Sequence, residues 1–176
     1  MPTGQNASIS APADAIFISI EMSRSKWLVG AHSPLSDKIS LHAVNWGDTG
    51  ALFAIVERLR KRTTETLGVH LPVLCCYEAG YEGFWLHRVL VAAGHRSIVI
   101  DPASLLVNRR AKRAKTDRID ARAMIRALIA FNRGEDQVLS AVQISSVEQD
   151  DARRLMRERQ RLIKERTAHT NRVRAY

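Results

Sequence analysis

The sequence has only two cysteines, Cys75 and Cys76, and they are adjacent. Neighbouring residues of a strand point to opposite faces of a sheet, so this pair is not expected to form a disulfide or a metal site. The histidines are scattered along the chain without the spacing of metal ligands. These absences argue against a disulfide-stapled secreted fold, and they predict buried thiols in a reducing cytoplasm.

Long apolar runs are also missing. No stretch is long and apolar enough to cross a bilayer, which takes about 20 consecutive residues. The N-terminal stretch has neither the basic start nor the apolar segment of a secretion signal, and residues 1–14 are predicted to be a disordered leader. With 45% hydrophobic and 26% charged residues, the composition is that of an ordinary globular protein, which we expect in the cytoplasm and without a membrane partner.

Positive charge is abundant but unevenly distributed. The net charge is +9, yet residues 1–108 hold nine basic and nine acidic residues and are neutral as a group. Residues 109–176 hold eighteen basic and nine acidic residues, so the whole excess lies there. A neutral body with a basic C-terminal third predicts a polyanionic partner, most simply nucleic acid.

The order of predicted elements indicates an α/β fold. Three strands joined by short polar turns are predicted near 16–21, 26–31 and 39–46, the first from its strand-like pattern with Ile16, Ile18 and Ile20 on one face, and the short turns favour an antiparallel meander. Helix, strand, helix, strand and helix are then expected near 49–66, 71–77, 81–93, 97–100 and 117–133. The run at 71–77 is apolar on both faces, as in a central parallel strand. We therefore predict a mixed sheet flanked by helices.

The C-terminal part reads differently. Residues 15–133 form the predicted α/β domain, 134–145 a linker loop, and 146–176 a basic helix that begins a coiled coil. Ser145 with Glu148, and Ser146 with Gln149, offer two overlapping capping boxes for this helix. A broken heptad-like apolar stripe runs along it, and no C-terminal cap follows. On this pattern the chain is expected to be truncated.

Four acidic residues occupy positions that such a fold can bring together. Glu21 ends the first strand, Glu78 ends the fourth, and Asp117 and Asp120 lie three residues apart at the start of a helix. If the first and fourth strands are neighbours, the glutamates share one end of the sheet and the helix brings the aspartates over it. Clustered carboxylates repel one another unless a cation lies between them, and Mg²⁺ (or Mn²⁺) prefers such oxygen ligands.

The residues beside these acids predict contact with phosphate. Six basic residues precede or flank the aspartates: Arg109, Arg110, Lys112, Arg113, Lys115 and Arg118. Two metal ions held by the acids would activate a nucleophile for phosphodiester cleavage, while the basic residues hold the backbone. Read alone, however, Asp117 and Asp120 are equally typical of a helix N-terminus, where acids suit the helix dipole.

Two motifs resemble those of a known family. Cys76-Tyr77-Glu78-Ala79-Gly80 and Lys115-Thr116-Asp117-Arg118-Ile119-Asp120-Ala121 are similar to motifs in the N-terminal domain of DEDD transposases. These are the insertion-sequence recombinases that resemble RuvC Holliday-junction resolvases. The resemblance extends over about residues 15–176, and it implies an RNase H-like (RuvC-like) fold followed by a helical coiled coil.

The resemblance also implies a function. In the family, four acids bind Mg²⁺ for DNA strand cleavage and recombination during DNA transposition, and by position they match Glu21, Glu78, Asp117 and Asp120. A C-terminal domain supplies a serine nucleophile, a structured RNA from the element takes part, and the proteins form oligomers, here expected through the C-terminal helix. This chain departs from the pattern at Glu21, where the family has aspartate, and no serine-bearing domain follows Tyr176.

Other interpretations stay open. The chain could be a nucleic-acid-binding module without catalysis, because of Glu21 and the missing domain, or an oligomerisation module built on the C-terminal helix. Asp101 precedes a proline and is interpreted as a turn residue rather than as a further ligand. Tyr81, Phe84 and Trp85 are expected to pack in the core rather than to stack on bases.

Overall fold

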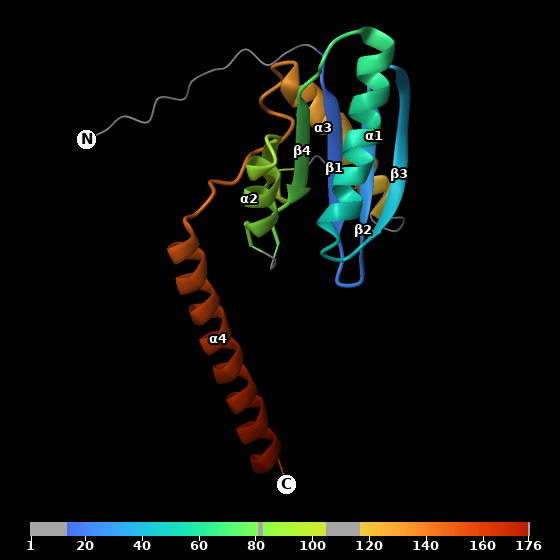
Figure 1. The fold of residues 1–176 in the computed structure, drawn as a ribbon. Helices are drawn as coiled ribbons and strands as arrows, with labels where there is room; N and C mark the ends of the chain where they lie inside the picture. The colour runs from blue at the N-terminus through green and yellow to red at the C-terminus, as the bar shows by residue number, and fades with distance from the viewer. Residues whose placement is uncertain (1–13, 81–82, 105–116, 176) are drawn as a thin grey trace, which may run out of the picture. The chain divides into compact units, whose positions relative to one another are not determined.

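The computed structural model describes residues 14–80, 83–104 and 117–175 and divides into two compact units, Met1–Val142 and Gln143–Tyr176 (Figure 1). The predicted leader therefore lies outside the described residues, apart from Asp14. None of the described helices is both long and apolar enough to cross a membrane.

The first unit is built on one five-stranded sheet. Its strands are β1 (Ile16–Met22), β2 (Lys26–Ser33), β3 (Ser36–Asn45), β4 (Val73–Glu78) and β5 (Arg96–Ile100). The order across the sheet is β3-β2-β1-β4-β5. The pairs β1–β2 and β2–β3 are antiparallel, whereas β1–β4 and β4–β5 are parallel. The predicted meander and the predicted central parallel strand are both confirmed, and this strand, β4, lies beside β1.

Helices cover both faces of this sheet. They are α1 (Thr49–Leu67), α2 (Trp85–Ala92) and α3 (Asp117–Asn132). In Figure 1, α1 lies in front of the sheet and α3 behind it, and both contact β1, β2 and β3. On the α1 side, the Trp85 ring of α2 lies 5.9 Å from that of Trp27. The predicted α/β fold, a mixed sheet flanked by helices of the RNase H-like type, is confirmed.

Two element boundaries differ most from the prediction. The third strand begins at Ser36 rather than near residue 39, because its exposed first residues continue the pairing with β2 through Ser33 and Ser36. The helix expected over 81–93 is shorter and begins at Trp85. Gly83 has φ +72°, a left-handed conformation that does not continue a helix, so Phe84 becomes the N-cap. Phe84 is 8% exposed, so it packs in the core as predicted, while Tyr81 lies outside the described residues.

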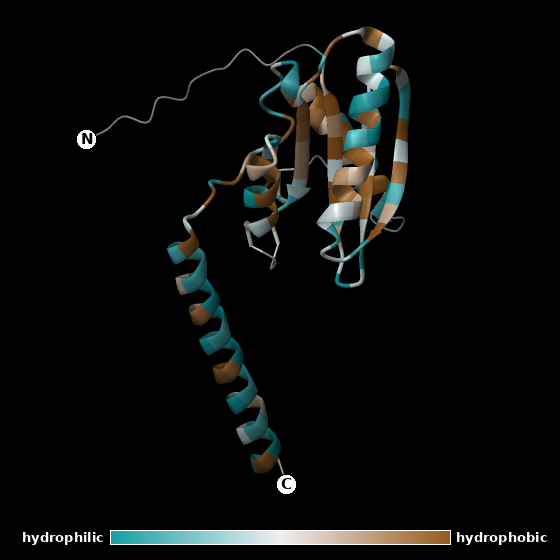
Figure 2. Ribbon diagram, viewed as in Figure 1, coloured by the Kyte–Doolittle hydropathy of each residue, from teal (hydrophilic) through white to brown (hydrophobic). Residues whose placement is uncertain are grey.

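Strand β4 is buried on both faces, and Figure 2 shows the apolar character of the central strands. Burial raises the pKa of Cys75 to about 12, and it raises the pKa of Cys76 well above its usual range. Since the thiolate is the reactive form, at pH 8 only about one Cys75 thiol in 10⁴ is reactive.

We therefore expect both cysteines to resist alkylation in the folded protein. Iodoacetamide at pH 8 should label them at least about 10³-fold more slowly than in the unfolded chain, as followed by mass spectrometry. The same reaction in 6 M guanidinium chloride (about 6 M is enough to unfold most domains) provides the control. Rapid labelling of one thiol in buffer would mean that one face of β4 is open to solvent.

Four histidines link the stability of this unit to pH. Burial, with a smaller effect of a nearby arginine, lowers the pKa of His32, His42, His87 and His95. The unfolded chain titrates near pH 6.5, so below that pH it binds more protons than the folded chain does. The contribution of these histidines to the free energy of unfolding is therefore fully present above about pH 6.5, the pKa in the unfolded chain. It is lost as the pH falls toward the lowered pKa values of the folded chain.

The free energy of unfolding measured in urea should therefore be lower at about pH 5.5 than at about pH 7.5. His95 is 7% exposed, and its ring lies 5.9 Å from that of Phe53. The variant His95→Gln should show a smaller difference between the two pH values, whatever its overall stability. An unchanged difference in that variant would contradict the assignment to His95.

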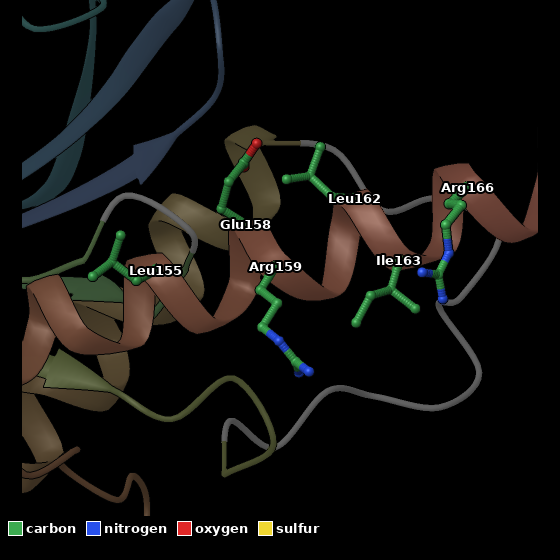
Figure 3. A pocket seen from close by; sticks show the side chains of 6 residues that line it. All are labelled: Leu155, Glu158, Arg159, Leu162, Ile163 and Arg166. Atoms are coloured by element: carbon green, nitrogen blue, oxygen red, sulfur yellow. The ribbon is translucent and has the colours of Figure 1, made fainter.

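The second unit contains one long helix, α4 (Val147–Arg174). Ser146 and Gln149 form its capping box, which confirms one of the two predicted boxes. Ser145 instead donates to a carboxylate oxygen of Asp150 and accepts from Arg153. Every described residue of α4 is exposed or partly exposed, and Figure 3 shows the apolar side chains of Leu155, Leu162 and Ile163 among charged neighbours. The apolar side chains of α4 thus form a stripe along the helix that is exposed or partly exposed.

Candidate metal centre

Glu21 and Glu78 lie side by side at one edge of the sheet. The parallel register of β1 and β4 pairs Ile20 with Tyr77, so the next residues, Glu21 and Glu78, are level with each other. Neighbouring strands are about 4.8 Å apart, and residues at the same level point to the same face. Both glutamates are half-buried, and Oε2 of Glu21 is shielded from solvent. The two glutamates are therefore neighbours near the ends of the two parallel strands.

Helix α3 covers the same face. Ser19, two residues before Glu21 and so on its face, donates a hydrogen bond of 2.8 Å to the carbonyl oxygen of Ala121. Cys76, two residues before Glu78, contacts the Met124 carbonyl oxygen through its Sγ, at 4.0 Å. The later part of the helix packs against Phe17 and Leu74, in one cluster with Leu128. The helix therefore runs antiparallel to β1, with its N-terminus at the edge that carries Glu21 and Glu78.

The first turn of α3 contributes the two aspartates. Asp117 and Asp120 lie four residues before Ala121 and Met124 respectively, which are both fully buried against the sheet. Residues four apart share a helix face, so both aspartates are on the sheet-facing side of α3. Asp120 is half-buried and Asp117 is exposed. The four predicted acids thus belong to one end of one face of the sheet.

The donor set has the chemistry of a hard cation site. All four groups are carboxylates, the ligands that Mg²⁺ and Mn²⁺ prefer. Within the described residues, however, no group of three or more His, Cys, Asp or Glu side chains is close enough to hold a metal. Glu21, Glu78 and Asp120 each have a further interaction of their own. The four residues thus have the right chemical type for such an ion, and they lie at the same edge of the sheet. The described side chains, however, do not form a closed ligand cluster.

The predicted phosphate-binding residues are placed only in part. Arg109, Arg110, Lys112, Arg113 and Lys115 lie outside the described residues. Arg118 is described, and it is exposed in the first turn of α3, next to Asp117. The helix N-terminus therefore carries acids on its inner side and a cation on its outer side.

Asp101 has the turn role that its sequence context favoured. Its Oδ1 accepts a hydrogen bond of 2.9 Å from the backbone N–H of Ala103, which closes a local turn after β5. The backbone N–H of Asp101 donates to the Ser140 carbonyl oxygen, and Ser104 Oγ accepts from the Ser140 N–H. These bonds tie the end of β5 to the segment that follows α3.

Two residues that position the site were missed by the sequence analysis. Ser19 is fully buried, and Gly30 is its partner across β1 and β2. A Cβ on Gly30 would lie 2.5 Å from Ser19 Oγ and 3.3 Å from the Ala121 carbonyl oxygen. The signal for Ser19 was present, as a polar residue in an otherwise apolar strand on the same face as Glu21. Together, Ser19 and Gly30 let α3 lie close against the sheet.

Comparisons with known proteins place the sequence in a family. The sequence profile of IS110-type DEDD transposases, described as a transposase, matches residues 51–176, which include Glu78, Asp117 and Asp120 but not Glu21. No solved structure matches the chain.

Two curated proteins of Sinorhizobium fredii are similar to this chain. The one named "Putative transposase y4rJ" is 44% identical over 160 residues, which is 90% of this chain and 40% of that protein. The one named "Putative transposase y4qE" is 34% identical over 131 residues, which is 74% of this chain and 31% of that protein. The chain therefore spans less than half the length of these relatives. Since the family profile covers most of its residues, the chain belongs to the IS110-type DEDD transposase family.

Proposed function

We propose that this chain is the N-terminal DEDD portion of a longer transposase, which cleaves and recombines DNA strands with the help of Mg²⁺ or Mn²⁺. The ligands would be Glu21, Glu78, Asp117 and Asp120. The observation that carries the proposal is the hydrogen bond from Ser19 to Ala121, because it holds the start of α3 at the edge where the two glutamates lie near the ends of their strands.

The chemistry of such a site divides between the ion and the chain. A bound divalent cation would stabilise negative charge on a phosphodiester and lower the pKa of an attacking hydroxyl or water. The carboxylates would hold the cation, and the fully buried Ala121 and Met124 fix the helix that carries two of them. Arg118, with Arg109, Arg110, Lys112, Arg113 and Lys115, would contact the DNA backbone. A serine nucleophile would come from another part of the longer protein.

The partners follow from the same proposal. DNA is the substrate, and a structured RNA of the element is a second nucleic-acid partner. Homo-oligomers would form through the apolar stripe of α4, whose Leu155 is 73% exposed and whose Val173 is 75% exposed. These partners are proposed for the longer protein to which this portion belongs.

Calorimetric titration with Mn²⁺ tests the metal site directly. The wild-type chain should show saturable binding, and Asp117→Ala should weaken it about tenfold or more, because a ligand is lost. Asp136→Ala is the matched control, since Asp136 is an exposed acid in the loop after α3. Equal binding by the wild type and Asp117→Ala, or no binding by either, would refute the proposed site.

A nucleic-acid-binding module without catalysis is the second candidate. Glu21 in place of aspartate, and the lack of a closed ligand cluster among the described side chains, favour it. This candidate predicts DNA binding that is unchanged by EDTA but falls steeply with added salt. It also predicts that Mn²⁺ has no effect on the chain, which separates it from the first proposal.

A further inference from the structure

The outer side of α3 carries a line of arginines. Arg118, Arg122 and Arg126 are spaced four residues apart, and all three are exposed. We call these three residues the α3 arginine stripe. Residues spaced in this way lie one above the other on a helix, so the stripe follows the helix axis. The opposite side of the helix, with Ala121, Met124 and Leu128, is buried against the sheet.

The charged faces of the other long helices contain ion pairs between neighbouring turns. On α1, Arg60 pairs with Glu57 at 3.2 Å and Lys61 with Glu65 at 3.9 Å. On α4, Arg161 lies 2.7 Å from Glu158 and 3.8 Å from Glu165. None of the three stripe arginines forms an ion pair with any residue that the structure describes, and the same holds for Arg58 and Arg62 of α1.

This arrangement does not help the helix to fold. Like charges four residues apart repel each other on a helix surface, and the stripe contains two such pairs. From Arg118 to Arg133 the only acid is Asp120, which belongs to the sheet-facing side. A partner of opposite charge would turn the repulsion into favourable contacts.

The dimensions of the stripe fit a nucleic-acid strand. Eight residues of α-helix rise about 12 Å, and one DNA strand carries a phosphate about every 3.4 Å along its axis, so about three phosphates lie within reach. The stripe begins at Arg118, beside the acids, and leads away from the edge that carries them. It is therefore placed to hold DNA that extends from a phosphodiester bound at the acids.

We infer that the α3 arginine stripe binds the phosphate backbone of the DNA duplex that flanks the acidic edge. The inference rests on the proposed function for the identity of the polyanion. It extends the binding surface to Arg122 and Arg126 and assigns it to the face of α3 directed away from the sheet. Contacts of this kind position the DNA without reading its sequence.

The test is the salt dependence of binding to a fluorescent DNA duplex of about 20 base pairs, measured by anisotropy in EDTA. Each phosphate neutralised contributes about 0.9 to the slope of log K against log salt. Replacing all three stripe arginines by glutamine should therefore make this negative slope shallower by about 2.7. The loss of affinity between 50 and 200 mM salt should then be about 40-fold smaller for the variant than for the wild type. Glutamine keeps a good helix propensity, so circular dichroism should show an unchanged fold.

Two further variants separate a specific track from general charge. Replacing Arg58, Lys61 and Arg62, which are exposed on α1, by glutamine removes the same charge from the other face of the sheet. This control should keep the wild-type slope, and so should the variant with lysine at all three stripe positions. The inference would be overturned if the salt slope changed equally in the stripe and α1 variants, or if it changed in neither.

The remaining outcomes distinguish the inference from the proposed function. If the stripe variant lost affinity for duplex RNA but not for duplex DNA, the assignment to DNA would be wrong. If its slope for DNA fell as expected while Asp117→Ala bound Mn²⁺ like the wild type, only the proposed metal site would fail. If the metal site were supported and the slope were unchanged, only the stripe would fail.

Discussion

Replacing Glu78 by glutamine should weaken Mn²⁺ binding by about 100-fold or more. Changes to residues that merely support metal ligands already cost about 10- to 100-fold in affinity, and the loss of a charged ligand should cost at least as much. Glu78 is the best of the four acids for this test, because it belongs to a strand that is paired on both sides. Strand β4 is paired with β1 and with β5, where Glu78 lies opposite Ile100.

Thermal unfolding with added metal gives this prediction a magnitude. At a Mn²⁺ concentration of about 100 times its dissociation constant, binding stabilises the folded chain by about 2.7 kcal/mol. For a chain of this size, that is a rise in Tm of about 5–10 °C. With 100-fold weaker binding, the same concentration stabilises Glu78→Gln by only about 0.4 kcal/mol, or about 1 °C.

Glu135→Gln is the matched control for this change. Glu135 is an exposed carboxylate just after α3, at the opposite end of the helix from Asp117, and the substitution is chemically the same. Its Mn²⁺-induced rise in Tm should equal that of the wild type. If Glu78→Gln kept the full rise, Glu78 would not be a ligand, and the carboxylate edge would need another explanation.

The fold was predictable because its signals were local. The two-face pattern of the first strand identified β1, the apolar run at 71–77 identified a strand covered on both faces, and short polar turns indicated the meander. The start of α2 was not predictable, because Gly83 adopts a positive φ that the hydrophobic pattern does not encode. Periodicity therefore located the elements, whereas backbone conformation set one of their boundaries.

The candidate site was predictable to a lesser degree. The ends of strands and helices indicated Glu21, Glu78, Asp117 and Asp120, and the observed pairing of β1 with β4 places the two glutamates together. The contact that brings α3 to them was not visible in the sequence. It depends on Ser19, Gly30 and Ala121, which are far apart in the chain and meet only when the helix lies on the sheet. Contacts between residues so far apart in the chain produce no periodic pattern in the sequence.

Gly30→Ala should destabilise the first unit by about 1–3 kcal/mol, the usual cost of overpacking a core. The new Cβ would lie 2.5 Å from Ser19 Oγ, and the hydroxyl cannot move away without losing its hydrogen bond to Ala121. The Ala121 carbonyl oxygen, at 3.3 Å, limits any shift of the helix toward Gly30. Denaturant unfolding should show the loss, and Mn²⁺ affinity should fall with it, because α3 is lifted away from Glu21 and Glu78.

Gly50→Ala provides a control of opposite sign. Gly50 lies in the first turn of α1, where a Cβ would make an ordinary contact of 3.4 Å with Asp48 Oδ1. Alanine in a helix is favoured over glycine by about 0.5–1 kcal/mol, so this variant should be as stable as the wild type or more so.

A double-mutant cycle then shows whether Ser19 is the cause of the Gly30 effect. Ser19→Ala removes the hydroxyl that the new Cβ would meet, so Gly30→Ala should cost less in that background than in the wild type. The coupling between the two substitutions should be at least about 0.5 kcal/mol, as is usual for residues in contact. Additive effects would mean that α3 is held against the sheet by its apolar side chains alone. Ser19 would then be a buried hydroxyl without a role in placing Asp117 and Asp120.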